Sequence, residues 1–352
     1  MATITDIANA ANVSISTVSR VLNYDESLSV TDETRRKIFE TAENLNYTKY
    51  KKKKRDRDQK AAKIAANAAS PALQGTIGIL LWRTDEEELD DIYYMSIRLG
   101  VEKKASELGY NVVKLYQLDD NLTTNLDGII AIGKFDAHTL EHIQTLNHNI
   151  CVIGTNFPIN NFDSVNTDFS QATDLALNHL LSLGHERIAF IGAEENQNMY
   201  GYREYKTPTI LTYLDIMKNK NLFSEDYFFV QNEKSLNVEV AKTLTKVALK
   251  KWKNNMPSAI LGLNDSVAIA IINTLQEEGF RIPEDISVMG INDISISQYV
   301  SPPLTTVKAF TEEMGETGIE ILHEQINKPS INKRIFLETE LVIRQSTARY
   351  EA

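Results

Sequence analysis

The chain has 352 residues, of which 42% are hydrophobic and 24% charged, and its formal net charge is −11. This length and composition predict a globular protein of two or three domains and argue against a disordered or fibrous chain. The chain has no apolar run of the roughly 18–20 residues that cross a bilayer, no signal-peptide pattern and a single cysteine, Cys151, so we expect a cytoplasmic protein without an intramolecular disulfide.

The charge is distributed unevenly along the chain. Residues 1–60 contain 12 basic and 9 acidic side chains, whereas residues 61–352 carry a net charge of −14. A basic head on an acidic body is the asymmetry expected when only the head contacts phosphates. The lysine run at 51–55 is by itself typical of a solvated segment and needs a DNA-binding motif beside it.

Two short helices are predicted at the N-terminus. Thr5 is expected to cap the first, which ends at Asn12, a residue type that tolerates the left-handed backbone of a tight turn. Either Ser14 or Ser16 caps the second helix, which runs to Asn23. Its inward face is predicted to consist of Val18, Val21 and Leu22, and its outward face of Ile15, Ser16, Thr17, Ser19 and Arg20.

A third helix is expected after Thr31, with Ile38, Ala42 and Leu45 along one side. It completes a three-helix core that ends near Tyr47. Two short helices joined by a tight turn are the layout that inserts the second helix into the major groove of DNA.

A long ordered pattern connects these elements: Thr5-Asp-Ile-Ala, Val13-Ser-x-Ser-Thr-Val-Ser-Arg-Val-Leu-Asn23, Val30-Thr-x-x-Thr-Arg35 and Leu45-Asn-Tyr47. It closely resembles the DNA-binding head of the lactose/galactose repressor family of bacterial transcription regulators. The resemblance implies contacts with operator DNA by Thr5, Ser14, Ile15, Ser16, Thr17, Ser19, Arg20, Asn23 and Arg35. Ile15 and Ser16 would read bases, Arg20 would contact guanine, and Asn23 and Arg35 would hold the backbone.

The segment that follows departs from the family. Repressors of this type carry a hinge helix whose leucine wedges into the minor groove. Here residues 60–69 are rich in alanine and are followed by Pro71, but no leucine stands at the expected place, where Ile64 is the nearest substitute. A hinge helix and a plain basic tether therefore remain two interpretations of this linker.

From Gly75 onwards, short apolar strands alternate with amphipathic helices. We predict strands at 77–81, 112–115, 128–132, 151–153, 187–191, 259–262 and 286–291, and helices at 95–108, 140–146, 171–183, 210–218, 238–251 and 267–278. Such alternation predicts an α/β body with two doubly wound parallel-sheet lobes beside the all-α head.

The body also carries family motifs, among them Leu183-Gly-His-Glu-Arg-Ile188, Asn264-Asp-Ser-Val-Ala-Ile269 and Pro302-Pro-Leu-Thr-Thr306. These resemble the periplasmic-binding-protein-like body of the same repressors, which implies two discontinuous lobes joined by three crossings. The expected domains are a helix-turn-helix domain at 1–57, a linker at 58–74 and an effector-binding and dimerisation domain at 75–346.

A sugar effector is expected in the cleft between the lobes, at the carboxyl ends of the strands. The candidate residues are Trp82, Arg203, Asn264, Asp265, Asn292 and Asp293. Several alternatives stay open: Asn264 and Asp265 also suit a helix cap, Asn292-Asp293 also suits a turn, and Trp82 either stacks on the sugar or packs. Arg203 is favoured over Lys206 as the effector arginine because lysine lacks the planar fork.

Nothing in the sequence matches a Walker loop, a nucleophile elbow or a metal-protease motif, so no catalytic site, cofactor or metal is expected. His138 and His142 have helical spacing but lack a third ligand and are interpreted as surface residues. The sequence thus predicts a homodimeric repressor of a sugar operon that binds double-stranded DNA and a small sugar, with no membrane partner. The stretch 128–135 resembles galactose and β-galactoside repressors, which points to galactose or a galactoside. A regulator activated by a corepressor, and a sugar-binding protein without a DNA role, are the alternatives.

Overall fold

The computed structural model forms two compact units, residues 1–72 and 73–352. It describes residues 3–22, 30–31, 34, 36–38, 41–42, 45, 74–82, 92–115, 125–155, 161–194, 207–231, 238–253 and 255–351. No helix within these ranges is long and apolar enough to span a membrane.

The head begins with helices α1 (Ile4–Ala11) and α2 (Ile15–Leu22). The predicted N-cap at Thr5 is wrong, because Thr3 caps α1 and forms a reciprocal capping box with Asp6. Asn12 has the expected left-handed backbone, with φ 56°. The two helices share a core of wholly buried side chains, which consists of Ile7, Val18, Val21 and Ile38 with their neighbours.

Two further predictions for the head concern its caps and its third helix. Ser14, rather than Ser16, caps α2, because its Oγ accepts a hydrogen bond from the Thr17 amide at 3.0 Å. Thr31 caps the third helix in the same way through the Thr34 amide at 3.2 Å. The expectation that Leu45 lies in the core is wrong, since this side chain is 37% exposed.

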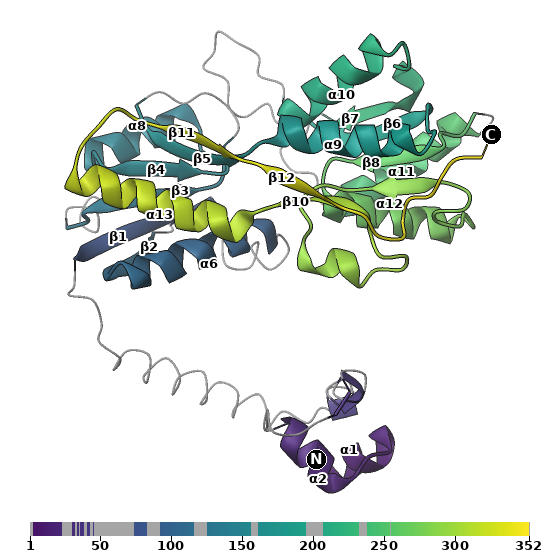
Figure 1. Cartoon of the computed structure of the whole chain (residues 1–352), viewed down its shortest axis with the longest axis horizontal. Coiled ribbons are helices and arrows are strands. Elements are labelled where there is room, and N and C mark those ends of the chain that lie inside the picture. The colour runs from purple at the N-terminus through teal and green to yellow at the C-terminus, as the bar shows by residue number, and fades with distance from the viewer. Residues whose placement is uncertain are drawn as a thin grey trace. The chain divides into compact units, whose positions relative to one another are not determined.

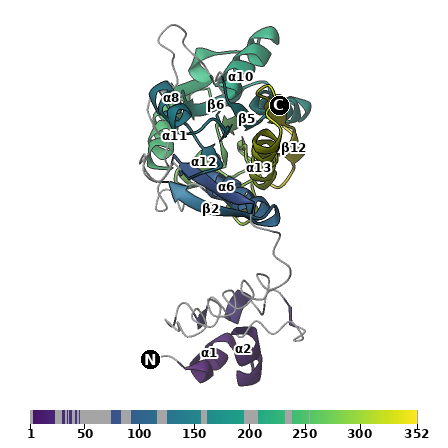
Figure 2. The same ribbon diagram turned by 90° about the vertical axis from the view of Figure 1, so that its left-hand side faces the viewer.

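The first lobe of the body is built on one parallel sheet, drawn in blue to teal with one yellow strand in Figure 1. Its strands, in spatial order β11-β5-β4-β3-β1-β2, are β11 (Arg334–Leu337), β5 (Asp163–Thr167), β4 (Ile150–Ile153), β3 (Gly128–Ile132), β1 (Gly75–Leu81) and β2 (Tyr110–Leu115). Helices α6 (Ile92–Glu107) and α13 (Thr311–Asn327) lie side by side on one face of this sheet (Figure 1, Figure 2). Helix α8 (Ala137–Leu146) covers the other face.

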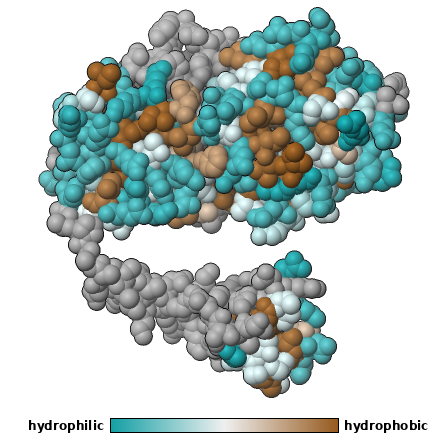
Figure 3. Space-filling view, viewed as in Figure 1, coloured by the Kyte–Doolittle hydropathy of each residue, from teal (hydrophilic) through white to brown (hydrophobic). Residues whose placement is uncertain are grey.

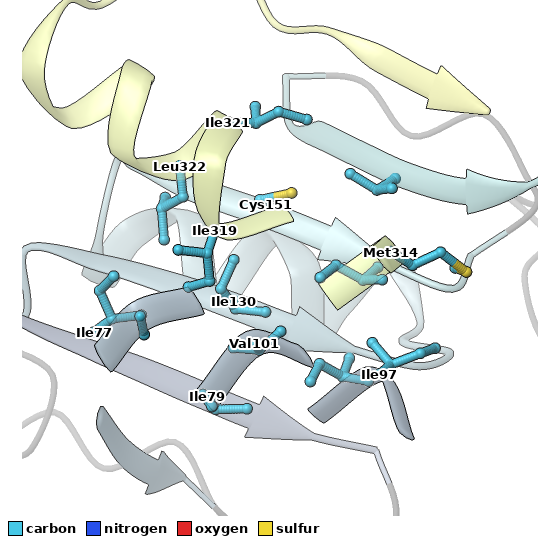
Figure 4. Close-up of a cluster of buried hydrophobic side chains, with 14 of the residues drawn as sticks. Ile77, Ile79, Ile97, Val101, Ile130, Cys151, Met314, Ile319, Ile321 and Leu322 are labelled. Carbon is cyan, nitrogen blue, oxygen red and sulfur yellow. The ribbon is translucent and has the colours of Figure 1, made fainter. Parts of the chain in front are cut away.

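Alternate residues of the central strands enter two different cores, as the twofold repeat of a strand requires. Ile77, Ile79 and Ile130 meet the helix residues Ile97 and Ile319 on one face, as Figure 4 shows. Figure 4 also places Cys151 beneath α13, where its side chain is fully buried. Burial raises the pKa of this thiol well above its ordinary value.

The second lobe repeats the same architecture on a four-stranded parallel sheet. Its strands, in spatial order β7-β6-β8-β9, are β7 (Phe228–Gln231), β6 (Ile188–Ala193), β8 (Ala259–Gly262) and β9 (Ser287–Met289). Helices α9 (Phe169–Ser182) and α10 (Pro208–Asn219) pack on one face, and α11 (Val238–Trp252) and α12 (Asp265–Glu277) pack on the other. Two short 3-10 turns, η1 (Glu225–Tyr227) and η2 (Ser295–Gln298), follow α10 and β9.

The chain crosses between the lobes three times, as the family resemblance implied. The first crossing leads from β5 into α9. The second is β10 (Thr306–Ala309), which leads into α13, and the third is β12 (Thr339–Val342), which leads out of β11. Strands β10 and β12 pair antiparallel, from Thr306 opposite Val342 to Ala309 opposite Thr339, and lie between the two lobes in Figure 1.

This topology determines on which side of each lobe the carboxyl ends of the strands lie. Strands β5 and β11 lead from their carboxyl ends into crossings, so the carboxyl edge of the first sheet lies towards the second lobe. In the second lobe, the residues after β9 form a parallel bridge with β10, which runs to the first lobe. The carboxyl ends of both sheets therefore lie on the sides of the lobes that the crossings connect.

Candidate functional site

Helix α2 presents the outward face that the sequence predicts. Ile15 is 51% exposed although it is a large apolar residue, Ser16 and Arg20 are exposed, and Thr17 and Ser19 are half-buried. The opposite face, with Val18 and its neighbours, is fully buried, so the helix is fixed with these five side chains outward. An apolar side chain beside an arginine on an exposed helix face suits contact with base edges, since it can meet a thymine methyl group while the arginine reaches guanine.

A cluster of hydroxyl groups lies at the N-terminus of α2. Ser14 Oγ lies 2.8 Å from both Ser16 Oγ and Thr17 Oγ1, and it accepts the Thr17 amide proton. The first amides of a helix have no partners within the helix and attract anions. The arrangement suits a DNA phosphate. Thr5 is exposed on α1, whereas Asn23 and Arg35 lie outside the described residues.

We expect Ser14→Ala to destabilise the head by about 1 kcal/mol, because the α2 N-terminus loses its only side-chain cap among the described residues. Thermal unfolding of the full chain followed by circular dichroism measures the effect. Ser16→Ala is the matched control, since Ser16 accepts no backbone amide among the hydrogen bonds that the structure describes. Equal stability of the two variants would show that Ser14 does not act as a cap.

In the first lobe, Trp82 follows β1 directly and is half-buried. Its amide donates to the Ile132 carbonyl at 3.1 Å, and its ring meets Tyr94 edge to face, with centroids 5.5 Å apart. Lys134 Nζ lies 5.4 Å from the ring centroid. The packing role of Trp82 is therefore plain, and stacking on a ligand stays a prediction for its remaining exposed surface.

In the second lobe, Asn264 is the N-cap of α12, where its Oδ1 accepts the Val267 amide proton at 2.9 Å. The helix-cap alternative is thus realised for this residue. Its side chain is only half-buried, so its amide nitrogen keeps the predicted ligand role open.

The prediction that Asp265 contacts the ligand is wrong, because its side chain is 0% exposed and both carboxylate oxygens already accept hydrogen bonds from the protein. Its Oδ2 accepts from the Ile294 amide at 2.9 Å and from Ser297 Oγ at 2.6 Å, and its Oδ1 accepts from Thr306 Oγ1 at 2.5 Å. Burial raises the pKa of Asp265 to about 6, although these hydrogen bonds act in the opposite direction. The carboxylate holds protein segments together instead of contacting a ligand.

Asn292 and Asp293 form a turn with positive φ at both residues, 123° and 54°. The Asp293 carboxylate pairs with Arg344 at 2.6 Å, so it has a partner within the protein. Asn292 differs, since its Oδ1 is buried and accepts no hydrogen bond from any described residue.

Among the described residues, six buried side-chain oxygens have no hydrogen-bond partner: Asp163 Oδ2 and Asn166 Oδ1 lie on β5 itself, and the other four lie beyond strands or at the start of a helix. Thr155 Oγ1 follows β4, Glu194 Oε1 follows β6, and Asn292 Oδ1 follows β9. Thr207 Oγ1, at the start of α10, is a fourth, and this threonine caps no helix amide. Buried polar groups are normally satisfied, so such a set points to an absent polar ligand. The sequence analysis missed Thr155, Glu194 and Thr207; the places of Thr155 and Glu194 shortly after strands β4 and β6 were a signal, whereas Thr207 at the start of α10 had none.

Arg203 and Lys206, the two candidates for the effector arginine, lie outside the described residues. Within the described part of the chain, no group of three or more His, Cys, Asp or Glu side chains is arranged to hold a metal ion.

Comparisons with known proteins agree with this division of the chain. Residues 3–49 match the model of "Bacterial regulatory proteins, lacI family", and residues 177–347 match "Periplasmic binding protein-like domain". The chain is 33% identical to the HTH-type transcriptional regulator GalR of Lacticaseibacillus casei, over 99% of this chain and 100% of that protein. It is 36% identical to the HTH-type transcriptional regulator GanR of Bacillus subtilis, over 98% and 99% respectively.

Among solved structures, the transcriptional regulator CelR in complex with cellobiose superposes with a TM-score of 0.65 at 21% identity, over 98% of this chain and 100% of that one. The lac repressor dimer bound to operator and the anti-inducer ONPF gives a TM-score of 0.62 at 22% identity, over 99% of each chain. Both structures share the fold of the described parts of this chain.

Proposed function

Because the chain belongs to the lacI family of bacterial regulatory proteins, we propose that it is a DNA-binding repressor of a sugar-utilisation operon, controlled by a small sugar bound between the lobes of its body. The observation that supports the DNA-binding part of this proposal is the outward face of α2. There Ile15, Ser16 and Arg20 are exposed, while the opposite face of the helix is buried. These three side chains lie on the face of α2 opposite the buried Val18 and Val21, where base edges can be reached.

The assembly we propose is a homodimer with twofold symmetry whose two heads read the halves of a pseudo-palindromic operator. The lac repressor in the superposed complex is a dimer bound to operator, which supports this arrangement. The body offers apolar surface for such a contact: Figure 3 shows brown patches on both lobes, and Tyr299 and Ile296 near η2 are 77% and 48% exposed.

The effector we propose is a sugar. Unpartnered oxygens of Thr155, Glu194, Thr207 and Asn292 would accept hydrogen bonds from its hydroxyl groups, and the threonines would also donate. The regulator CelR, which shares the fold, was solved with cellobiose. Galactose or a galactoside is our choice within this class, because of the stretch 128–135, and Arg203 is our choice of effector arginine.

Regulation in this proposal runs through the crossings. A sugar that contacts both lobes favours one angle between them. Because β10 and β12 join the lobes, these strands move when the angle changes. In a dimer, a change of lobe angle alters the spacing of the two heads and so the affinity for the operator.

Calorimetric titration of the full chain with galactose, lactose, melibiose and cellobiose tests the effector. We expect binding of at least one sugar and a Kd about tenfold or more weaker for Asn292→Ala, because a hydroxyl group of the bound sugar then loses its buried acceptor, Asn292 Oδ1. Asn111→Ala on the exposed face of β2 is the matched control. Arg203→Ala and Lys206→Ala, titrated in parallel, decide which of these residues is the effector arginine. If none of the four sugars binds, the effector assignment fails. Gel shifts with the promoter region of the gene that encodes this protein still test DNA binding.

A further inference from the structure

The turn after β9 is fixed from three directions within three consecutive residues. Asn292 is bound by β10, Asp293 by Arg344, and Ile294 by the buried Asp265 carboxylate. Asn292 and Asp293 both have a positive backbone φ, which residues other than glycine rarely adopt. Such a backbone persists only where its surroundings hold it in place.

Each of the three contacts leads to a crossing. The Asn292 amide donates to the Val307 carbonyl at 2.8 Å, and the Ala309 amide donates back to Asn292 at 3.2 Å, so this residue is bound directly to β10. Arg344 follows β12 by two residues, and it donates to Asp293 Oδ1 at 2.6 Å and to the Leu304 carbonyl at 2.9 Å.

Asp265 completes the arrangement from the side of α12. Its two oxygens join the Ile294 amide and the Ser297 hydroxyl of η2 to the hydroxyl of Thr306, the first residue of β10. Gly290 lies directly against this carboxylate. A Cβ at position 290 would overlap Asp265 Oδ1, so a glycine is needed here for Asp265 to keep its place. Arg344 and Asp293 are both largely buried, at 18% and 16% side-chain exposure, so their ion pair is shielded from solvent.

We propose that Asp265 and Arg344 are positioning residues that hold Asn292 in its strained conformation on β10, so that a sugar bound at Asn292 acts directly on the strands that join the lobes. The inference rests on the proposed function, in which Asn292 contacts the effector. Neither residue touches the sugar. Their role is to connect the ligand-binding turn to both returning crossings.

The test compares sugar binding, stability and DNA release in Asp293→Asn, Arg344→Gln, the double variant and Asp265→Asn. The probe is galactose, or whichever of lactose, melibiose and cellobiose the wild type binds most tightly. We expect the Kd for the sugar to rise about tenfold in each single variant, since a buried charged hydrogen bond is lost. The ratio of operator Kd values with and without saturating sugar should fall towards 1 in the same variants.

Arg281→Gln is the matched control, because Arg281 forms an ion pair of the same length, 2.6 Å, with Asp285 elsewhere in the second lobe, where the arginine is 72% exposed. Its sugar Kd should equal that of the wild type. In the double variant, the Kd should resemble that of Asp293→Asn alone, as expected for two residues that act through one contact.

The outcomes separate the two proposals. If the variants lower the melting temperature while the sugar Kd and the operator ratio stay at wild-type values, Asp265 and Arg344 are merely structural and the inference is wrong. If the two single effects on Kd add fully in the double variant, the proposed pairing is wrong. A wild-type chain that binds no sugar of the panel overturns the proposed effector and this inference with it.

Discussion

Replacing Arg20 with alanine is expected to lower operator affinity by roughly thirtyfold or more. A bidentate contact between arginine and guanine contributes about 1–3 kcal/mol, and a symmetric dimer loses it twice. Arg20 lies on the exposed face of α2, whereas α2 contributes Val18, Val21 and Leu22 from its opposite face to the core of the head. The loss should therefore appear in DNA binding, whereas the melting temperature of the head should change little, because interactions of exposed charged side chains contribute about 1 kcal/mol or less.

Gel shifts at fixed salt, with DNA from the chain's own promoter and a scrambled duplex, measure this effect. Lys37→Ala is the matched control, because it removes the same charge from another exposed position of the head. Its loss should be small and similar on both duplexes, since a phosphate contact carries no sequence information. Arg20→Lys keeps the charge without the planar fork and should lose most of the specificity. Equal losses for Arg20→Ala and Lys37→Ala would show that Arg20 reads no base.

Much of the head was predictable because its signals are local. The spacing of Val18, Val21 and Leu22 fixed the buried face of α2, and Asn12 marked the left-handed turn. At the start of α1, the N-cap was assigned to Thr5 although the nearby Thr3 is the capping residue. Thr3 and Asp6 have the spacing of a capping box, and the three hydrogen bonds that this pair makes outweigh a cap at Thr5.

In the body, the sequence revealed the strands that are apolar throughout, but several elements were missed. Strand β5, Asp163–Thr167, is polar in sequence although all five residues are buried. Strand β11 pairs with it in register from Arg334 opposite Ser164, a contact between distant parts of the chain. Half-exposed strands such as β11 and β12 lack the apolar run that identifies a central strand. Helix α13 was missed too.

At the candidate ligand site, the sequence pattern did not show which side chains are buried. Asn264 and Asp265 are adjacent and both suit a cap or a ligand contact, yet one caps α12 and the other is wholly buried. What separates them is the position of Ser297 and Thr306, which reach Asp265 only in the folded lobe. Sequence patterns report residue types near a strand end, whereas burial depends on partners from distant segments.

Helices α6 and α13 approach each other backbone to backbone at Gly100 and Gly315. Gly315→Val is expected to destabilise the first lobe by about 3 kcal/mol or more, because a Cβ at this position would overlap the Ile97 carbonyl oxygen and the Val101 amide of α6. A Cβ at Gly100 would overlap the Glu312 carbonyl in the reverse direction, so the two backbones approach closely along a short stretch. Backbone atoms cannot rotate away as a side chain can.

The helices cannot relieve this overlap by moving apart. Ile97 and Val101 on α6, and Met314 and Ile319 on α13, are 0% exposed and pack into the same core against the first sheet (Figure 4). A shift of either helix would open a cavity in that core, which carries its own cost. The exposed pairs of Lys103 with Glu312 and Glu316 bridge the helices but contribute little against this cost.

Thermal and urea unfolding of the full chain measure the effect, with Glu313→Val as the matched control because it places the same β-branched residue on the exposed side of α13. The control should lose less than about 1 kcal/mol. Since α13 returns to the first lobe through β10 and leaves it through β11 and β12, a weakened α13 should also weaken the effect of sugar on operator binding. A Gly315→Val chain as stable as the control would mean that the close approach of α6 and α13 does not hold the lobe together.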